Sequence, residues 1–187
     1  MQPNITNGFI NGIDTDALRG VVDAVKHDAA KGMISYTVRT DWQGQTRSLA
    51  RAVDMTLAGV KTNRTFAMPA DEPAELLGED TAPNPQELLF AGLNACMIAT
   101  FVIGAAIRGV KLTSLAIETS GELDLRGFLG IDAAVKPGYD TIRYRLIVSG
   151  DGTPEQYEEI HRNCQRVSPN RFNLAMPVNF EGSVQVI

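Results

Sequence analysis

Two kinds of apolar spacing occur along the chain. Intervals of three and four predict an amphipathic surface helix over 14–30, with Thr15 as its cap, and a second one over 153–166, which Pro169 ends. Segments typical of strands, several of which alternate apolar and polar residues, lie over 33–39, 48–57, 66–68, 111–124, 139–150 and 178–187. The first two strands are joined by a glycine-containing turn, so we expect a hairpin.

A long apolar helix over 88–107 separates the early strands from the later ones. Asn84 is a good N-cap, Pro85 suits the first turn, and Glu87 stands at the N3 position of a capping box. The helix is apolar on every side and rich in glycine and alanine, as expected at the centre of a core. Together these elements predict an α+β fold in two layers, with sheet covering helix.

The same helix is long enough to span a bilayer, which takes about 20 residues. Against that interpretation, Asn94 and Thr100 lie within it, no belt of Trp or Tyr flanks it, and a capping sequence typical of soluble proteins precedes it. These features favour a buried helix, and we expect no membrane contact.

Composition narrows the choice of function. The 187 residues suit one domain with a terminal extension, and 44% hydrophobic with 21% charged residues is typical of a globular protein. A net charge of -5 does not favour nucleic acid as a partner. Two cysteines do not make a disulfide framework, and the first ten residues do not resemble a signal peptide, so we expect a cytoplasmic protein.

Cys96 is the main chemical candidate. In a crowded apolar helix, a thiol is either an inert core residue or an activated nucleophile. Cys96 lies about three turns inside its helix, too far from the N-terminus for the helix dipole to activate it. A reactive thiol at this position therefore needs help from a neighbouring group, ideally a cation.

The run from Pro83 to Cys96, which opens P-N-P-Q-E-L-L, resembles the helix opening that carries the peroxidatic cysteine in the OsmC/Ohr family of thiol peroxidases. Further motifs follow the family's order: Asp71-Glu72-Pro73, Gly121-Glu122-Leu123-Asp124, Arg126-Gly127-Phe128 and Ser168-Pro169. The resemblance predicts an OsmC/Ohr-like domain over 33–187 and leaves 1–32 as an N-terminal helical extension.

The resemblance implies an intertwined homodimer, in which long cysteine-bearing helices pack centrally and β-sheets wrap around them. It also implies a chemistry. The thiolate attacks a hydroperoxide and becomes a sulfenic acid, which a second cysteine converts into a disulfide. An arginine and a glutamate position the first thiol, and no metal or organic cofactor is required.

Two positions depart from the family pattern. Gln86 stands where the family has its glutamate. The adjacent Glu87 lies roughly opposite Cys96 on the helical wheel. Glu87 therefore either reaches Cys96 across a dimer interface or serves only the capping box. Ser168 replaces the resolving cysteine. The only other thiol, Cys164, lies about one helical turn earlier and is either a displaced resolving cysteine or a packed core residue.

The activating arginine has two candidates. Arg64 is preferred and Arg39 is the alternative, although each also suits a solvated surface. His161 and Cys164 have a spacing that suits metal ligands, but the sequence offers few further ligands for a metal. Cys96 and His161 would suit a hydrolase, but no local motif supports that reaction.

The leading prediction is a thiol-dependent peroxidase that reduces organic or fatty-acid hydroperoxides through Cys96. Arg64 would hold the thiolate, and the disulfide partner of Cys96 would be Cys164 or an external dithiol. Gln86 and Ser168 favour an alternative, a non-catalytic OsmC-like protein that binds a small hydrophobic ligand at the dimer interface. In that alternative Cys96 is unreactive or a redox sensor.

Overall fold

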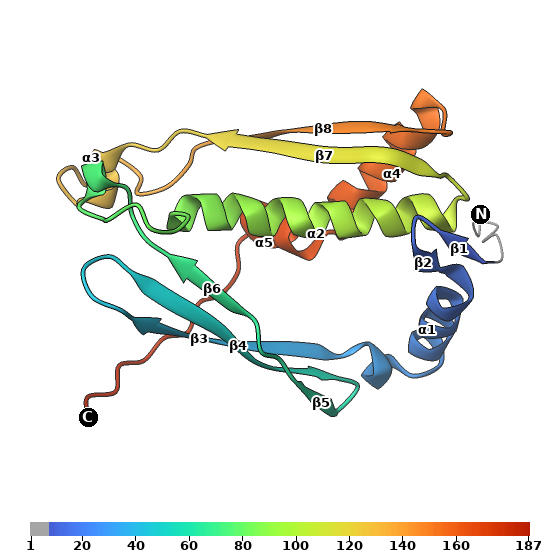
Figure 1. Cartoon of the computed structure of the whole chain (residues 1–187), viewed down its shortest axis with the longest axis horizontal. Coiled ribbons are helices and arrows are strands. Elements are labelled where there is room, and N and C mark those ends of the chain that lie inside the picture. Colours follow the sequence, from blue (N-terminus) through green and yellow to red (C-terminus); the bar gives the residue numbers. More distant parts are fainter. Residues whose placement is uncertain (1–7) are drawn as a thin grey trace. The chain divides into compact units, whose positions relative to one another are not determined.

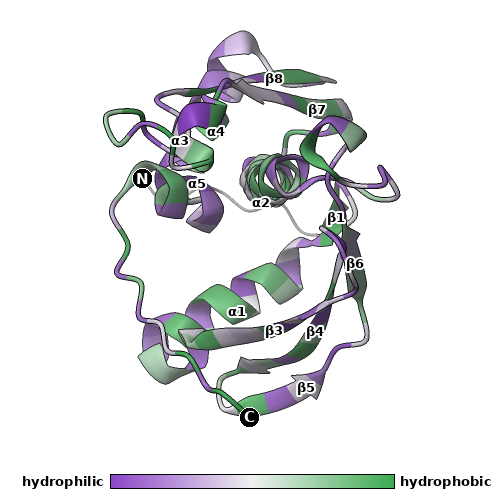
Figure 2. Ribbon diagram, turned by 90° about the vertical axis from the view of Figure 1, so that its left-hand side faces the viewer, coloured by the Kyte–Doolittle hydropathy of each residue, from purple (hydrophilic) through white to green (hydrophobic). Residues whose placement is uncertain are grey.

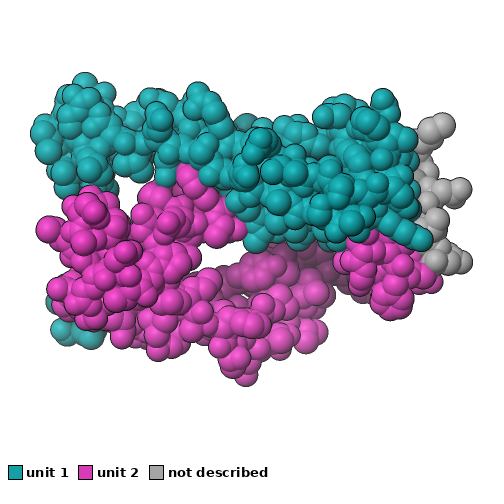
Figure 3. Space-filling view, turned by 45° about the horizontal axis from the view of Figure 1, so that its top comes forward, with its two compact units in different colours: residues 1–4, 92–187 teal, residues 5–91 magenta. Residues whose placement is uncertain are grey.

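The computed structural model describes residues 8–187, which form two compact units (Figure 3). One unit comprises 8–91 and the other 92–187. The boundary falls inside helix α2 (Pro85–Ile107), which begins in the first unit and continues in the second (Figure 1). The expected division into 1–32 and 33–187 stays a prediction.

The first unit begins with two short antiparallel strands, β1 (Phe9–Ile10) and β2 (Ile13–Asp14), followed by helix α1 (Thr15–His27). The predicted helix is present, but its cap is Asp14 rather than Thr15, because Asp14 Oδ1 accepts hydrogen bonds from the first-turn amides. The Thr15 hydroxyl instead donates to the Gly8 carbonyl at 2.7 Å. The helix ends earlier than expected and is followed by a 3-10 turn, Ala29–Gly32.

An antiparallel sheet follows, made of β3 (Ile34–Trp42), β4 (Ser48–Leu57), β5 (Val60–Asn63) and β6 (Ala67–Ala70). The β3–β4 hairpin confirms the predicted one, with Trp42 opposite Ser48 and Ile34 opposite Leu57. Strand β4 is central, since β5 pairs with its second half and β6 with its first half.

Strand β5 was not expected from the sequence, because it is short and mostly polar. It is joined to β4 by a two-residue turn in which Ala58 and Gly59 both have positive φ, at 51° and 78°. Two positive φ angles are typical of the tight turns whose twist matches a hairpin, so the turn, rather than apolar patterning, specifies this strand.

The loop between β6 and α2 is built around the carboxylate of Asp71, which is only 1% exposed. Asp71 accepts hydrogen bonds from the hydroxyls of Thr46 and Thr81 at 2.8 Å. It also accepts from the backbone amides of Glu72, Glu79 and Thr81 at 2.9–3.1 Å. Burial alone raises the pKa of Asp71, but these hydrogen bonds outweigh it and hold the pKa well below its usual range.

The second unit combines the remainder of α2 with β7 (Leu112–Gly121), α3 (Leu125–Phe128), β8 (Ile142–Gly150), α4 (Pro154–Val167) and α5 (Pro169–Ala175). Strands β7 and β8 form an antiparallel pair, with Leu112 opposite Gly150 and Gly121 opposite Ile142. Both strands begin or end a few residues inside the predicted ranges. Together with the sheet of the first unit, these elements confirm the predicted α+β class.

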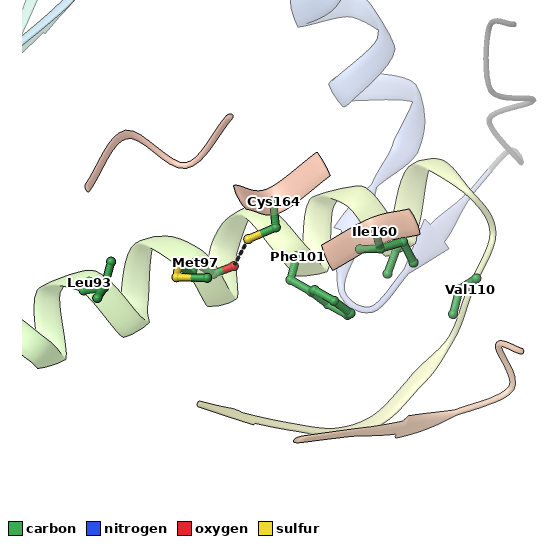
Figure 4. Packing of buried hydrophobic residues seen from close by; sticks show 7 residues of the cluster. Leu93, Met97, Phe101, Val110, Ile160 and Cys164 are labelled. Carbon is green, nitrogen blue, oxygen red and sulfur yellow. Dashed lines mark hydrogen bonds between the residues drawn. The ribbon is translucent and has the colours of Figure 1, made fainter. Parts of the chain in front are cut away.

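The core of the second unit lies where α2 meets α4 (Figure 4). Met97 and Phe101 of α2 and Ile160 and Cys164 of α4 are completely buried. One face of the β7–β8 pair packs against this cluster through its half-buried residues, which are Leu112, Leu115, Ile117, Ile142, Tyr144, Leu146 and Val148. The apolar residues of α2 (Figure 2) are thus covered where the helix faces α4 and the β7–β8 pair.

In the C-terminal part, one helix was not expected and one expected strand is wrong. Pro169 ends α4 as predicted, but it also begins α5, because proline is well suited to the first turn of a helix. The segment 178–187 has the alternation of a strand but forms none. Its apolar side chains are exposed, Phe180 at 96%, and within residues 8–187 the segment pairs with no strand that would complete its backbone hydrogen bonds.

Candidate active site at Cys96

The start of α2 shows the expected capping box. Asn84 Oδ1 accepts from the Glu87 amide at 2.8 Å, and Glu87 Oε2 accepts from the Asn84 amide at 2.8 Å. The Glu87 carboxylate is therefore engaged at the helix start, nine residues before Cys96, and Gln86 is exposed to solvent. The local sequence pattern thus accounts for Glu87 without any role in catalysis.

Cys96 is half-buried on α2, and two hydrogen-bond donors point at its sulfur. The Ser168 hydroxyl lies 3.3 Å from Cys96 Sγ, and the backbone amide of Asn170 lies 3.5 Å from it. Both donors come from the junction of α4 and α5, more than 70 residues away in sequence. Hydrogen bonds donated to a sulfur favour its charged form over its neutral form.

The α4–α5 junction is fixed to α2 by further contacts. The side-chain amide of Asn170 donates to the Gly92 carbonyl at 2.8 Å, one helical turn before Cys96. The Ser168 amide closes α4 by donating to the Cys164 carbonyl at 3.0 Å. Ser168 is the N-cap residue of α5, but its side chain makes no capping hydrogen bond and is completely buried against Cys96.

Cys164 is in a different environment. Its thiol is completely buried and donates to the Met97 carbonyl at 3.3 Å (Figure 4). Burial, and secondly the nearby Cys96, raise the pKa of Cys164 from 9.0 to about 11. In the reduced protein Cys164 is therefore a neutral core residue, and it becomes available to Cys96 only if this part of α4 moves.

The two arginine candidates lie in the unit of 8–91. Arg64 is exposed, with its guanidinium 4.8 Å from the ring centre of Phe66, and Arg39 forms an ion pair with Asp41 at 2.8 Å. The activating roles expected for Arg64, Gln86 and Glu87 stay predictions.

A polar group lies between α4 and β8. The Tyr144 hydroxyl is 2.8 Å from His161 Nε2 and accepts from the side chain of Gln165 at 2.9 Å. These residues line an open cavity of about 570 Å³ between β8 and α4. Among residues 8–187, no group of three or more His, Cys, Asp or Glu residues is placed to hold a metal ion.

Sequence reasoning missed the two donors to Cys96. It treated Ser168 only as a lost cysteine and did not consider Asn170. The available signal was a small polar residue directly before Pro169, which marks the start of a helix whose first amides need acceptors.

A long apolar helix carrying a half-buried thiol, packed against an antiparallel strand pair, defines an α+β protein with a cysteine-centred site. A family model described as OsmC-like protein matches residues 78–182, which is more than half of the chain. The protein therefore belongs to the OsmC-like family, as its sequence motifs predicted. A search of curated proteins finds no match.

Solved structures support the same fold. An OsmC-like protein from Mycoplasma pneumoniae matches with a TM-score of 0.60 and 15% identity, over 75% of this chain and 86% of that one. An organic hydroperoxide resistance protein from Elizabethkingia anophelis matches at 0.53 and 16%, over 78% and 91%. The organic hydroperoxide resistance protein OsmC from Legionella pneumophila matches at 0.51 and 17%, over 75% and 89%. The predicted OsmC/Ohr-like fold is confirmed.

Within residues 8–187, α2 is the one helix long and apolar enough to cross a membrane. The core helix of a soluble protein meets the same criterion, so length and composition alone do not distinguish the two.

Proposed function

We propose that this protein is a thiol-dependent peroxidase that reduces organic or fatty-acid hydroperoxides through Cys96. The observation that carries the proposal is the half-buried sulfur of Cys96, with two hydrogen-bond donors directed at it from Ser168 and Asn170. Family membership supports it, as do two neighbours of the same fold that are named organic hydroperoxide resistance proteins.

The first step is a displacement at the peroxide oxygen. The Cys96 thiolate forms a bond to one peroxide oxygen, the O–O bond breaks, and the leaving alkoxide takes a proton to become the alcohol. The sulfur is oxidised to a sulfenic acid, and the hydroperoxide is reduced. A second thiol then forms a disulfide with that sulfur and releases water. Cys164 is one candidate for the second thiol, and an external dithiol is the other.

We further propose that the working form is a cytoplasmic homodimer. Along α2, every fourth residue is exposed: Ala91, Ala95, Ala99 and Ile103. Three of these four residues are small, so another backbone can approach closely, and a second copy of α2 would cover the apolar stripe. In such a dimer, Arg64 would be available to assist Cys96, as would the partner subunit's Glu87 once it leaves its capping hydrogen bond.

A second function keeps the fold without the reaction. Gln86 carries no charge and Ser168 no thiol, which suits an OsmC-like protein that binds a small hydrophobic ligand while Cys96 is unreactive or acts as a sensor. The two functions differ in whether Cys96 changes when a hydroperoxide is supplied.

The test uses the full chain, fully reduced, with one equivalent of cumene hydroperoxide, followed by mass spectrometry without reductant. If the protein is a peroxidase, Cys96 is oxidised within seconds and the peroxide is lost. Both changes should be absent in C96S and retained in C164S. A disulfide between Cys96 and Cys164 would make Cys164 the second thiol, whereas a sulfenic acid on Cys96 alone would require an external one. If peroxide persists and Cys96 is unmodified, the peroxidase is refuted and the binding function is favoured.

A further inference from the structure

Cys96 is oriented by neutral donors from its own unit. No charged residue occurs on α2 between Glu87 and Arg108. Helices α4 and α5 carry further ionisable groups. Cys164, which interacts electrostatically with Cys96, is neutral in the reduced protein, while Arg166 and Arg171 donate to the Asn163 side chain at 2.8 Å and to the Gln165 carbonyl at 3.2 Å. The contacts made with Cys96 Sγ itself come from a hydroxyl and an amide.

The Ser168 hydroxyl is unusual for a residue at the start of a helix. A serine at this position normally accepts a hydrogen bond from an amide of the first turn. Here it makes no such bond, is completely buried, and points at Cys96 Sγ. The backbone amide of Asn170, which would usually donate a hydrogen bond to a capping side chain, is directed at the same sulfur. Cys96 thus takes the place of the capping acceptor.

We infer that Ser168 is a positioning residue that holds the Cys96 sulfur as a hydrogen-bond acceptor and so favours its thiolate. A thiolate accepts hydrogen bonds much better than a thiol, because hydrogen bonds to charged groups are roughly twice as strong as neutral ones. Two donors fixed on the sulfur therefore stabilise the charged form relative to the neutral one. Ser168 then has a role of its own and is more than a missing thiol.

The inference rests on the proposed function for its purpose, since a peroxidase needs the thiolate, but its test requires no turnover. We would follow the alkylation of Cys96 by iodoacetamide across a series of pH values, reading the Cys96 peptide by mass spectrometry. S168A is expected to slow the alkylation of Cys96 roughly tenfold at neutral pH and to move the midpoint of the rate upward, because the variant loses a hydrogen bond to the charged sulfur.

T100A is the matched control. The Thr100 hydroxyl donates to the backbone carbonyl of Cys96 at 2.8 Å, so its removal deletes a hydroxyl beside the same residue without touching the sulfur. Its midpoint should match that of the wild type. A purely structural role for Ser168 would change the alkylation rate by the same factor at every pH and leave the midpoint in place, which would overturn the inference.

A second variant guards against misfolding of S168A. In S168C, the introduced thiol replaces a hydroxyl that lies 3.3 Å from Cys96 Sγ. Diamide, which oxidises thiol pairs without any peroxidase step, should therefore produce a disulfide between the introduced thiol and Cys96. Absence of that disulfide would refute the contact on which the inference depends.

The outcomes separate the two proposals. If the wild type consumes peroxide while S168A keeps the wild-type midpoint, the function stands and the role of Ser168 fails. If S168A moves the midpoint while no peroxide is consumed, Ser168 holds the thiolate of a protein that is not a peroxidase.

Discussion

The buried thiol of Cys164 makes stability depend on alkaline pH. In the folded state its pKa is raised from 9.0 to about 11 by burial and by the nearby Cys96. The folded protein therefore keeps this proton while the unfolded chain loses it, so the contribution is fully present below about pH 9 and is lost between about pH 9 and 11. Each pH unit is worth about 1.4 kcal/mol, so the expected loss is about 3 kcal/mol.

The measurement is urea unfolding of the reduced protein at several pH values from 7.5 to 11, compared with C164S. Serine retains a donor for the Met97 carbonyl, which Cys164 contacts at 3.3 Å, but does not titrate in this range. Groups distant from residue 164 that titrate above pH 9 affect both proteins equally, so the difference between the two curves isolates Cys164 together with its interaction with Cys96. Parallel curves over the whole range would show that the Cys164 proton is not held by the fold, and the reasoning would be refuted.

Three further outcomes follow from the packing. F101A removes a completely buried ring and should lower the free energy of unfolding by about 3–5 kcal/mol in a denaturant titration. G78A should cost about 3 kcal/mol or more in the same assay, because the new Cβ would lie 1.7 Å from the Glu72 carbonyl oxygen, whereas G138A, with nothing within 4 Å, should cost far less. D71N should lower the melting temperature at pH 7; because the pKa of Asp71 is depressed, this difference should shrink as the pH falls below about 4, and a constant difference would contradict the role of the charge.

Features set by neighbouring residues were predictable from the sequence. The capping boxes at Asn84 and Thr153, and the hairpin of β3 and β4, depend on residues within a few positions of one another, so the local pattern suffices. The family motif from Pro83 to Cys96 could be recognised for a similar reason, because all its residues lie at the start of one helix and along it. The motif in turn predicted the fold.

Features that depend on residues far apart in the sequence could not be predicted from it. The contact of Ser168 with Cys96 joins positions 72 residues apart, and no local pattern indicates which acceptor a buried hydroxyl will find. The expected strand over 178–187 failed for the complementary reason. Alternating apolar residues indicate that one face of a segment could pack on a core. A strand also needs a neighbouring strand for its backbone hydrogen bonds, and apolar spacing does not reveal whether one is present.

The conformation of the loop between β6 and α2 is set by the Asp71 carboxylate and depends little on which residues occupy the solvent-exposed positions of the loop. Because one side chain and close backbone contacts hold the chain path, positions such as Glu75 and Leu77, which face solvent, contribute little to it. Leu77, with a φ of 65°, even occupies a conformation that suits asparagine or glycine better. Substitution is thus tolerated at the solvent-exposed positions of the loop but not at Asp71 or Gly78, so new surface properties can be acquired there while the loop stays anchored to the β-sheet.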